Sequence, residues 1–175
     1  IMKATAGGGS SQLDLSAYID PIARGRTKGT GLAIYRISYS LVNSETANIV
    51  AVDDPEGGIL SVSLQAGAGL GDIATGGAVS SASIDTFSMT NALLVGGTNF
   101  YSPSSYPGAM SAFQTYASPT EDVPYVIVRD NVCLVYNVDA NKKFIEDCTL
   151  SVRLECAQIS LDQATLNQLL RTQTV

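Results

Sequence analysis

The sequence predicts an all-β fold, an antiparallel β-sandwich or barrel of about eight strands followed by one C-terminal helix. In most regular segments apolar and polar residues alternate with a period of two, as on a strand with one buried face. Segments rich in Gly, Pro, Asn and Asp separate these runs, and strands do not alternate with helices as in a parallel α/β sheet. Of the 175 residues, 45% are hydrophobic, enough for the core of one domain.

Two parts are expected along the chain: a flexible N-terminal arm over residues 1–28 and a β-sandwich domain over residues 29–175. Residues 1–11 are rich in Gly and Ser, a composition typical of mobile segments. Within the arm, the alternation from Gln12 to Ile22 predicts a short ordered strand, and a single helical turn is the alternative.

The clearest strand runs from Gly31 to Val42, where Tyr and Ile suit a pleated surface. Its alternation places five residues on one face: Ala33, Tyr35, Ile37, Tyr39 and Leu41. A shorter strand is expected from Ala47 to Val52, and a turn from Asp53 to Gly58. The strand from Ile59 to Gln65 follows, with three inward side chains: Leu60, Val62 and Leu64.

The middle of the chain is less regular. Residues 66–83 are almost all small, so we expect a long loop there, with a short edge strand at Ala78–Ile84. Phe87–Val95 is predicted as a strand. Gly96–Pro124 contains four prolines and is predicted as a long loop.

The C-terminal third shows the strongest patterns. Pro124–Arg129 and Val132–Asp139 are predicted to form a hairpin around Asp130-Asn131. Thr149–Ile159 is predicted as a long strand with four inward residues: Leu150, Val152, Leu154 and Cys156. The Ser-x-x-Gln pattern from Ser160 to Gln163 resembles a capping box and predicts a helix at about 161–172, with an apolar stripe of Leu166, Leu169 and Leu170.

The charge pattern limits the partners. The formal net charge is −6, and the sequence contains no histidine to serve as a base or metal ligand. We expect no strong nucleic-acid binding, since that requires clustered Lys and Arg. The only basic cluster, Arg24, Arg26 and Lys28, fits either a contact with an acidic partner or a solvated loop. No apolar run approaches about 18 residues, so no transmembrane segment is expected.

Only 15% of the residues are charged, below the roughly 25% of an average domain. A monomer stays soluble through a well-charged surface. The composition therefore favours a chain that hides surface against neighbouring subunits, with an acidic secreted protein of ordinary neutral surface as the alternative.

No catalytic, cofactor-binding or metal site is expected. The segment Gly67–Gly71 departs from a dinucleotide-binding fingerprint because Asp72 stands at the last glycine position. Asp53, Asp54 and Glu56 match no EF-hand spacing and suit a turn.

An enzyme is not expected either. The carboxylate pairs Glu121-Asp122 and Glu146-Asp147 point to opposite faces of an extended chain, so neither forms a natural acid–base dyad. Serine nucleophiles lack a histidine base. A hydrolase with an unorthodox site is the remaining enzymatic alternative.

The three cysteines, Cys133, Cys148 and Cys156, are an odd number, which in a chain of this length does not indicate a disulfide framework. They lie in strand-like segments, where Cys behaves as a small hydrophobic residue. We therefore expect buried free thiols, and one disulfide between neighbouring strands is the alternative.

Three tyrosines in the Tyr/Pro-rich 100–120 loop are candidate partner contacts: Tyr101, Tyr106 and Tyr116. Tyr and Pro together provide rigid amphipathic contact area for a glycan, a receptor or another subunit. The alternative is a loop that folds over one end of the sandwich and buries its own rings.

The layout of a Gly/Ser-rich arm, about eight strands in one small domain and long loops resembles the single jelly-roll capsid proteins of small icosahedral viruses. The resemblance implies a jelly-roll sandwich of two four-stranded sheets. It also implies a self-assembling shell subunit in the virion, in contact with copies of itself and with other shell proteins. The arm is less basic than in members that package RNA, which implies a subunit that does not neutralise the genome. The alternative function is a secreted, lectin-like binding module that uses the 100–120 loop.

Overall fold

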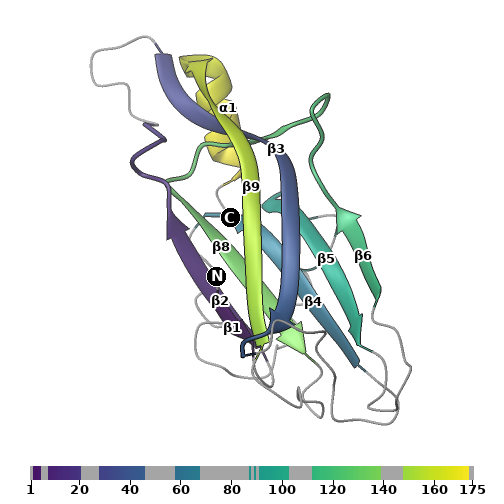
Figure 1. Cartoon of the computed structure of the whole chain (residues 1–175). Coiled ribbons are helices and arrows are strands. Elements are labelled where there is room, and N and C mark those ends of the chain that lie inside the picture. The colour runs from purple at the N-terminus through teal and green to yellow at the C-terminus, as the bar shows by residue number, and fades with distance from the viewer. Residues whose placement is uncertain are drawn as a thin grey trace.

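The computed structural model describes residues 2–4, 8–20, 28–45, 58–67, 87, 89, 91–102, 112–138 and 148–173. They form two antiparallel sheets that face each other (Figure 1). The four-stranded sheet has the order β1 (Met2–Ala4), β9 (Cys148–Asp162), β3 (Lys28–Asn43) and β7 (Tyr125–Ile127). The five-stranded sheet has the order β2 (Gly8–Asp14), β8 (Asn131–Val138), β4 (Gly58–Ala66), β5 (Leu94–Ser102) and β6 (Ala112–Ala117). The predicted β-sandwich is confirmed.

The strand pairing is nested, as in a jelly roll. β1 pairs with β9, β2 with β8, β3 with β7, and β4 with β5, all antiparallel. The ladders β3–β9 and β4–β8 join these pairs into the two sheets. The same nested pairing results when one long antiparallel hairpin is rolled up so that its strands are divided between two sheets. β6 is an additional strand at the edge beside β5.

The central strand β3 changes the face it turns to the core. Before a bulge in its pairing with β9, between Ile34 and Arg36, the core residues are Leu32 and Ile34. After the bulge they are Ile37, with Tyr39 and Leu41 packed against the core. A bulge inserts one extra residue, so the alternation shifts by one. The single face predicted for Ala33, Tyr35 and Ile37 is therefore wrong upstream of the bulge.

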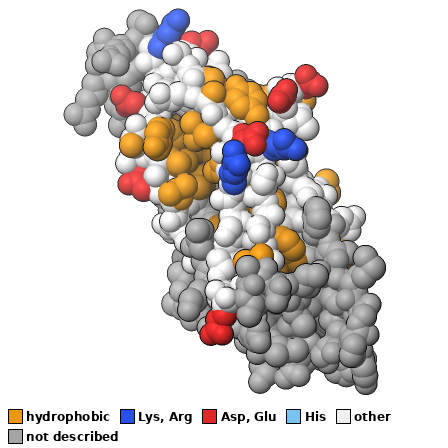
Figure 2. All heavy atoms as spheres, viewed as in Figure 1, with side chains coloured by type: hydrophobic (Ala, Val, Ile, Leu, Met, Phe, Trp, Pro, Cys, Tyr) orange, Lys and Arg blue, Asp and Glu red, His pale blue; other side chains and the backbone are white. Residues whose placement is uncertain are grey.

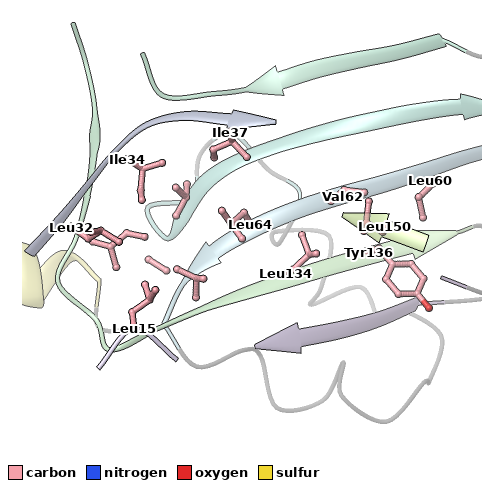
Figure 3. Packing of buried hydrophobic residues seen from close by; sticks show 14 of the residues in the cluster. Leu15, Leu32, Ile34, Ile37, Leu60, Val62, Leu64, Leu134, Tyr136 and Leu150 are labelled. Atoms are coloured by element: carbon pink, nitrogen blue, oxygen red, sulfur yellow. The ribbon is translucent and has the colours of Figure 1, made fainter. Parts of the chain in front are cut away.

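The core fills the space between the sheets (Figure 3). The inward side chains predicted for β4 are confirmed, since Leu60, Val62 and Leu64 are all buried in it. β9 contributes Leu150, which is completely buried, with Val152 and Leu154 packed at the margin. Ser63 and Gln65, on the other face of β4, are also buried, so this strand has two covered faces rather than one.

The C-terminal helix α1 (Gln163–Thr172) starts two residues later than expected. Its N-cap is Asp162, whose side chain accepts a 2.7 Å hydrogen bond from the Thr165 N–H, rather than Ser160. Leu166 is fully buried and lies over Gly29 of β3, where a Cβ would come within 3.2 Å of it. The helix therefore covers the start of β3.

Hydrogen bonds of Gln173 connect the C-terminal end of this helix to the segment around β7. Its Nε2 donates to the Val126 carbonyl at 2.6 Å, and its Oε1 accepts from the Val128 N–H at 3.2 Å. The Arg129 Nε donates to the Gln173 carbonyl at 2.9 Å. These contacts satisfy polar groups at a buried helix end.

Residues 1–28 were expected to be a flexible arm, but part of this segment forms strands of the two sheets. Within the predicted arm, β1 is an edge strand of one sheet and β2 is an edge strand of the other. Gly9 faces Tyr136 across the β2–β8 ladder, and a Cβ there would lie 2.7 Å from the tyrosine ring. The glycine is thus a packing requirement rather than a sign of mobility. The strand predicted from Gln12 ends at Asp14 and gives way to a turn, the alternative that the pattern left open.

The bounds of β5 contradict two predictions, the strand at Phe87–Val95 and the loop at Gly96–Pro124. It begins at Leu94 and contains Gly96 and Gly97. The ring of Tyr116 lies so close over Gly97 that no Cβ could be accommodated there. The 100–120 segment thus includes the end of β5 and all of β6.

The predicted hairpin around Asp130-Asn131 is also wrong. β7 pairs with β3 in one sheet, and β8 pairs with β2 and β4 in the other, so the short connection crosses between the layers. The strands predicted at Ala47–Val52 and Ala78–Ile84, and the turn from Asp53, lie outside the described residues.

The face assignment of β9 can be tested by paired substitutions. Leu150→Ala should lower the free energy of unfolding by about 2–5 kcal/mol, because it leaves a cavity in the core. Arg153→Ala should lower it by less than about 1 kcal/mol, since the side chain is exposed. Urea denaturation of the two variants measures the difference. Equal small effects would contradict the assigned register.

Two half-buried tyrosines predict a loss of stability at high pH. Burial raises the pKa of Tyr116 and of Tyr125 to about 12, from the ordinary value of 10. The Tyr125 hydroxyl donates to the Ala92 carbonyl at 2.8 Å. Because the unfolded chain releases these protons first, the contribution of the two tyrosines to the free energy of unfolding should be constant below pH 10 and be lost as the pH rises from 10 towards 12. Urea denaturation across this range should show a shallower fall in Tyr125→Phe. An unchanged slope would contradict the proposed burial effect.

Candidate functional site: an apolar cleft between the sheets

The sandwich is hollowed on the side where β2 and β9 form the rims. A cleft of about 600 Å³ opens there between the two sheets. It is lined by inward residues of both sheets and by the turn after β2, among them Leu13, Leu15, Leu64, Val152, Leu154 and Cys156. Figure 2 shows apolar side chains gathered on this face, over the region between β2 and β9. The cleft is thus a partly exposed extension of the core.

β9 has a partner strand on each edge at its start. β1 pairs with Cys148, Thr149 and Leu150 of β9. β3 pairs with the opposite edge of β9 along its length. The β9 residues that line the cleft, Val152, Leu154 and Cys156, follow the segment that pairs with β1.

Large apolar side chains lie on the rim opposite β9. Leu13 at the end of β2 is 55% exposed, and Tyr18 in the following turn is 56% exposed. The same turn buries Leu15 and Ile19 in the core. The segment from Leu13 to Ile19 therefore buries two residues and presents two others to solvent, an arrangement typical of an interaction surface.

Local hydrogen bonds build this turn. The Ser16 N–H donates to the Asp14 carboxylate at 2.8 Å, and this bond, with one from the Ser16 side chain, lowers the pKa of Asp14. The Tyr18 N–H donates to the Leu15 carbonyl at 2.8 Å. Gln158 of β9 reaches across, and its Nε2 donates to the Tyr18 carbonyl at 2.6 Å. This last contact joins the turn to β9.

The predicted contact residues do not come together in this cleft. Lys28 lies at the start of β3, opposite Asp162 of β9. Tyr101 is half-buried on β5, and its hydroxyl donates to Gln114 Oε1 at 3.2 Å. Tyr116 is half-buried on β6, and its hydroxyl donates to the Val62 carbonyl at 3.0 Å. Arg24, Arg26 and Tyr106 lie outside the described residues. At least Tyr116 therefore packs within its own domain.

The cysteines are all free. Cys133 and Cys148 are buried as expected, and burial raises the pKa of the Cys133 thiol. Cys156 is exposed at the cleft, which corrects the expectation that it is buried. Cys156 lies on the face of β9 that was predicted to point inward. At this position along the strand, however, that face no longer packs in the core.

Over the described part of the chain, no group of three His, Cys, Asp or Glu residues could hold a metal ion. Glu121 and Asp122 lie exposed in a bend, while Asp53, Asp54, Glu56 and the pair at 146–147 lie outside the described residues. No described helix is long and apolar enough to cross a membrane.

Sequence reasoning missed the cleft, although it recognised several of its residues. The inward positions Val152 and Leu154 were predicted, and so was an alternation that includes Leu13 and Leu15. The feature of the sequence that could have indicated the cleft is Leu13, an apolar residue next to Asp14, the last residue of β2. What the pattern cannot convey is that the turn after β2 lies across from β9, with the cleft between them.

Comparison with protein-family models, with curated proteins and with solved structures gives no match. The function is therefore argued from the fold and from this cleft.

The apolar rim can be tested with the dye 1-anilinonaphthalene-8-sulfonate, which binds exposed apolar surface. Leu13→Asn should reduce the fluorescence of the dye bound to the native protein, because Leu13 lines the cleft. The matched control is Ile59→Asn, which changes a residue 47% exposed outside the cleft and should leave the signal close to wild type. Equal losses in both variants would show that the dye does not report on the cleft.

Proposed function

We propose that this chain is a non-enzymatic structural subunit that assembles with copies of itself, as a shell protein of the viral capsid type located in the virion. The observation that carries the proposal is a sandwich with jelly-roll strand order and an apolar cleft between its sheets, at whose rim Leu13 and Tyr18 are exposed. A self-assembling subunit needs surfaces of this kind, which become buried only when a neighbour docks.

The chemistry of the chain supports this choice among proteins with a similar architecture. Jelly rolls occur in capsid proteins, lectins and cupins. A metal site built on imidazole ligands is not available to this sequence, which has no histidine. A lectin-like role was expected to use the tyrosines of residues 100–120. Tyr116 instead uses its hydroxyl to bond the backbone of its own chain.

The charge content fits the same proposal. With 15% charged residues and a net charge of −6, the surface is poorly suited to neutralising a genome. The proposed partners are copies of this chain and other shell proteins, and no cofactor takes part in the function.

The proposal predicts large assemblies. Purified protein at physiological salt should sediment as capsomer-sized oligomers or closed particles, and negative-stain electron microscopy should show particles of uniform size. A chain that stays monomeric at all concentrations would contradict the proposal. A small oligomer that a sugar column retains, and free sugar releases, would favour the lectin-like alternative.

A further inference from the structure

We propose that two copies of this chain pack through the outer face of the four-stranded sheet, about a two-fold axis that runs parallel to β3. This inference rests on the proposed function and names one contact between copies. The contact joins an acidic turn of each copy, at residues 120–123, to Arg153 of the other copy. The partner is a second copy because this chain carries both halves of the contact.

The outer face of this sheet presents polar side chains to solvent. After the bulge in β3, Ile37 faces the core, and the residues that alternate with it face outward. Exposed side chains on this face include Arg36, Ser38 and Ser40 of β3, with Arg153 and Glu155 of β9. The small serines near its centre allow a second sheet to approach to the usual spacing of packed sheets, about 10 Å.

Arg153 gives this face an excess positive charge. Arg36 and Glu155 lie directly opposite each other in the β3–β9 ladder, a cross-strand pair of opposite charges. The residue opposite Arg153 is Ser38, which carries no charge. Two arginines and one glutamate thus give this part of the face a charge of +1, on a chain whose formal net charge is −6. The face therefore suits a partner that brings carboxylates.

Carboxylates of this kind lie in the turn that precedes β7. Glu121 and Asp122 are exposed, and Val123 beside them is 73% exposed. Thr120 holds the turn, because its N–H donates to the Val123 carbonyl at 3.2 Å and its hydroxyl oxygen accepts from the Val123 N–H at 3.2 Å. A carboxylate pair on a turn with a fixed backbone loses less entropy on binding than one on a mobile segment.

The order of the strands determines how the two groups lie in the sheet. β9, β3 and β7 are neighbours in that order, so Arg153 and the acidic turn lie on opposite sides of β3. β7 pairs with β3 from Leu32 to Ile34, so the residues before Tyr125 lead towards the part of β3 that follows Ile34. Arg153 pairs with Ser38 in that same part. Figure 2 shows acidic and basic side chains close together on the face that β3 and β9 present.

A two-fold axis parallel to β3 matches these charges twice. The axis runs between the two faces, so that β7 of each copy lies over β9 of the other and β3 lies over β3. Each acidic turn then faces Arg153 of the second copy, and the serines of β3 meet at the axis. Arg36, also near the axis, has Glu155 of its own chain on one side and Glu155 of the second copy on the other. Because each copy offers the same patch, the contact closes as a dimer with aligned sheets.

Charge reversal tests the contact in the full chain. One variant is Arg153→Glu, and the other is Glu121→Lys with Asp122→Lys; all three positions are exposed, so urea denaturation should show wild-type stability. Each variant alone should raise the dimer dissociation constant by about tenfold in sedimentation velocity, because both contacts become repulsive. An equimolar mixture of the two should restore the wild-type constant, because both contacts of the mixed dimer again join opposite charges. A wild-type chain that forms no dimer, or a mixture that restores nothing, would overturn the inference.

The matched control is Arg171→Glu, the same charge change at an exposed position on α1. It should keep the wild-type constant, and it should not restore dimers of the variant with the reversed turn. Salt provides a second measurement on the unchanged chain. Raising NaCl from about 0.1 M to about 1 M shortens the Debye length from about 10 Å to about 3 Å, so the dissociation constant should rise. Equal effects of Arg171→Glu and Arg153→Glu, or a constant that salt does not change, would contradict the inference.

These outcomes separate the two proposals. Large particles that form equally well from wild type and from Arg153→Glu would leave the shell function standing and overturn the sheet contact. A charge-dependent dimer that forms nothing larger would support the contact and contradict the shell function.

Discussion

The long antiparallel ladder between β3 and β9 is the interaction on which the rest of the structure depends. It runs from the Lys28–Asp162 pair to the Asn43–Cys148 pair and forms the centre of the four-stranded sheet. The bulge between Ile34 and Arg36 lets one strand bury even-numbered residues at one end and odd-numbered residues at the other. The helix follows directly from the end of β9 and returns over Gly29. The edge of β9 that β3 does not use is the rim of the cleft.

Close contacts between glycine and tyrosine allow the five-stranded sheet to form from segments whose composition suggests loops. Gly9 leaves room for the Tyr136 ring in the β2–β8 ladder, and Gly97 leaves room for Tyr116 at the β5–β6 edge. Glycine costs more conformational entropy in a strand than a larger residue does. Burial of the tyrosine rings and the hydroxyl bond from Tyr116 to Val62 offset that cost.

An apolar cleft with exposed Leu13 and Tyr18 at its rim is a liability for a protein that remains alone, because exposed apolar surface favours unspecific association. In the proposed assembly a neighbouring subunit covers this surface. The low overall charge has the same physical meaning, because surface that is covered by neighbours need not be charged to stay soluble. The proposed role thus accounts for composition, topology and cleft together.

Local periodicity was sufficient to predict those elements in which the alternation of apolar and polar residues reflects one buried face. The sequence by itself determined the sandwich class, the strands β3, β4 and β9, the existence of the helix and the inward positions Val152 and Leu154. Only the tertiary structure decided that the glycine-rich β2 and β5 are strands, that β7 and β8 belong to different sheets, and where β3 bulges. It also decided that the cleft exists. The physical reason is that these features depend on which distant segment lies alongside, such as Tyr136 beside Gly9 or Tyr116 beside Gly97, and no local pattern contains that information.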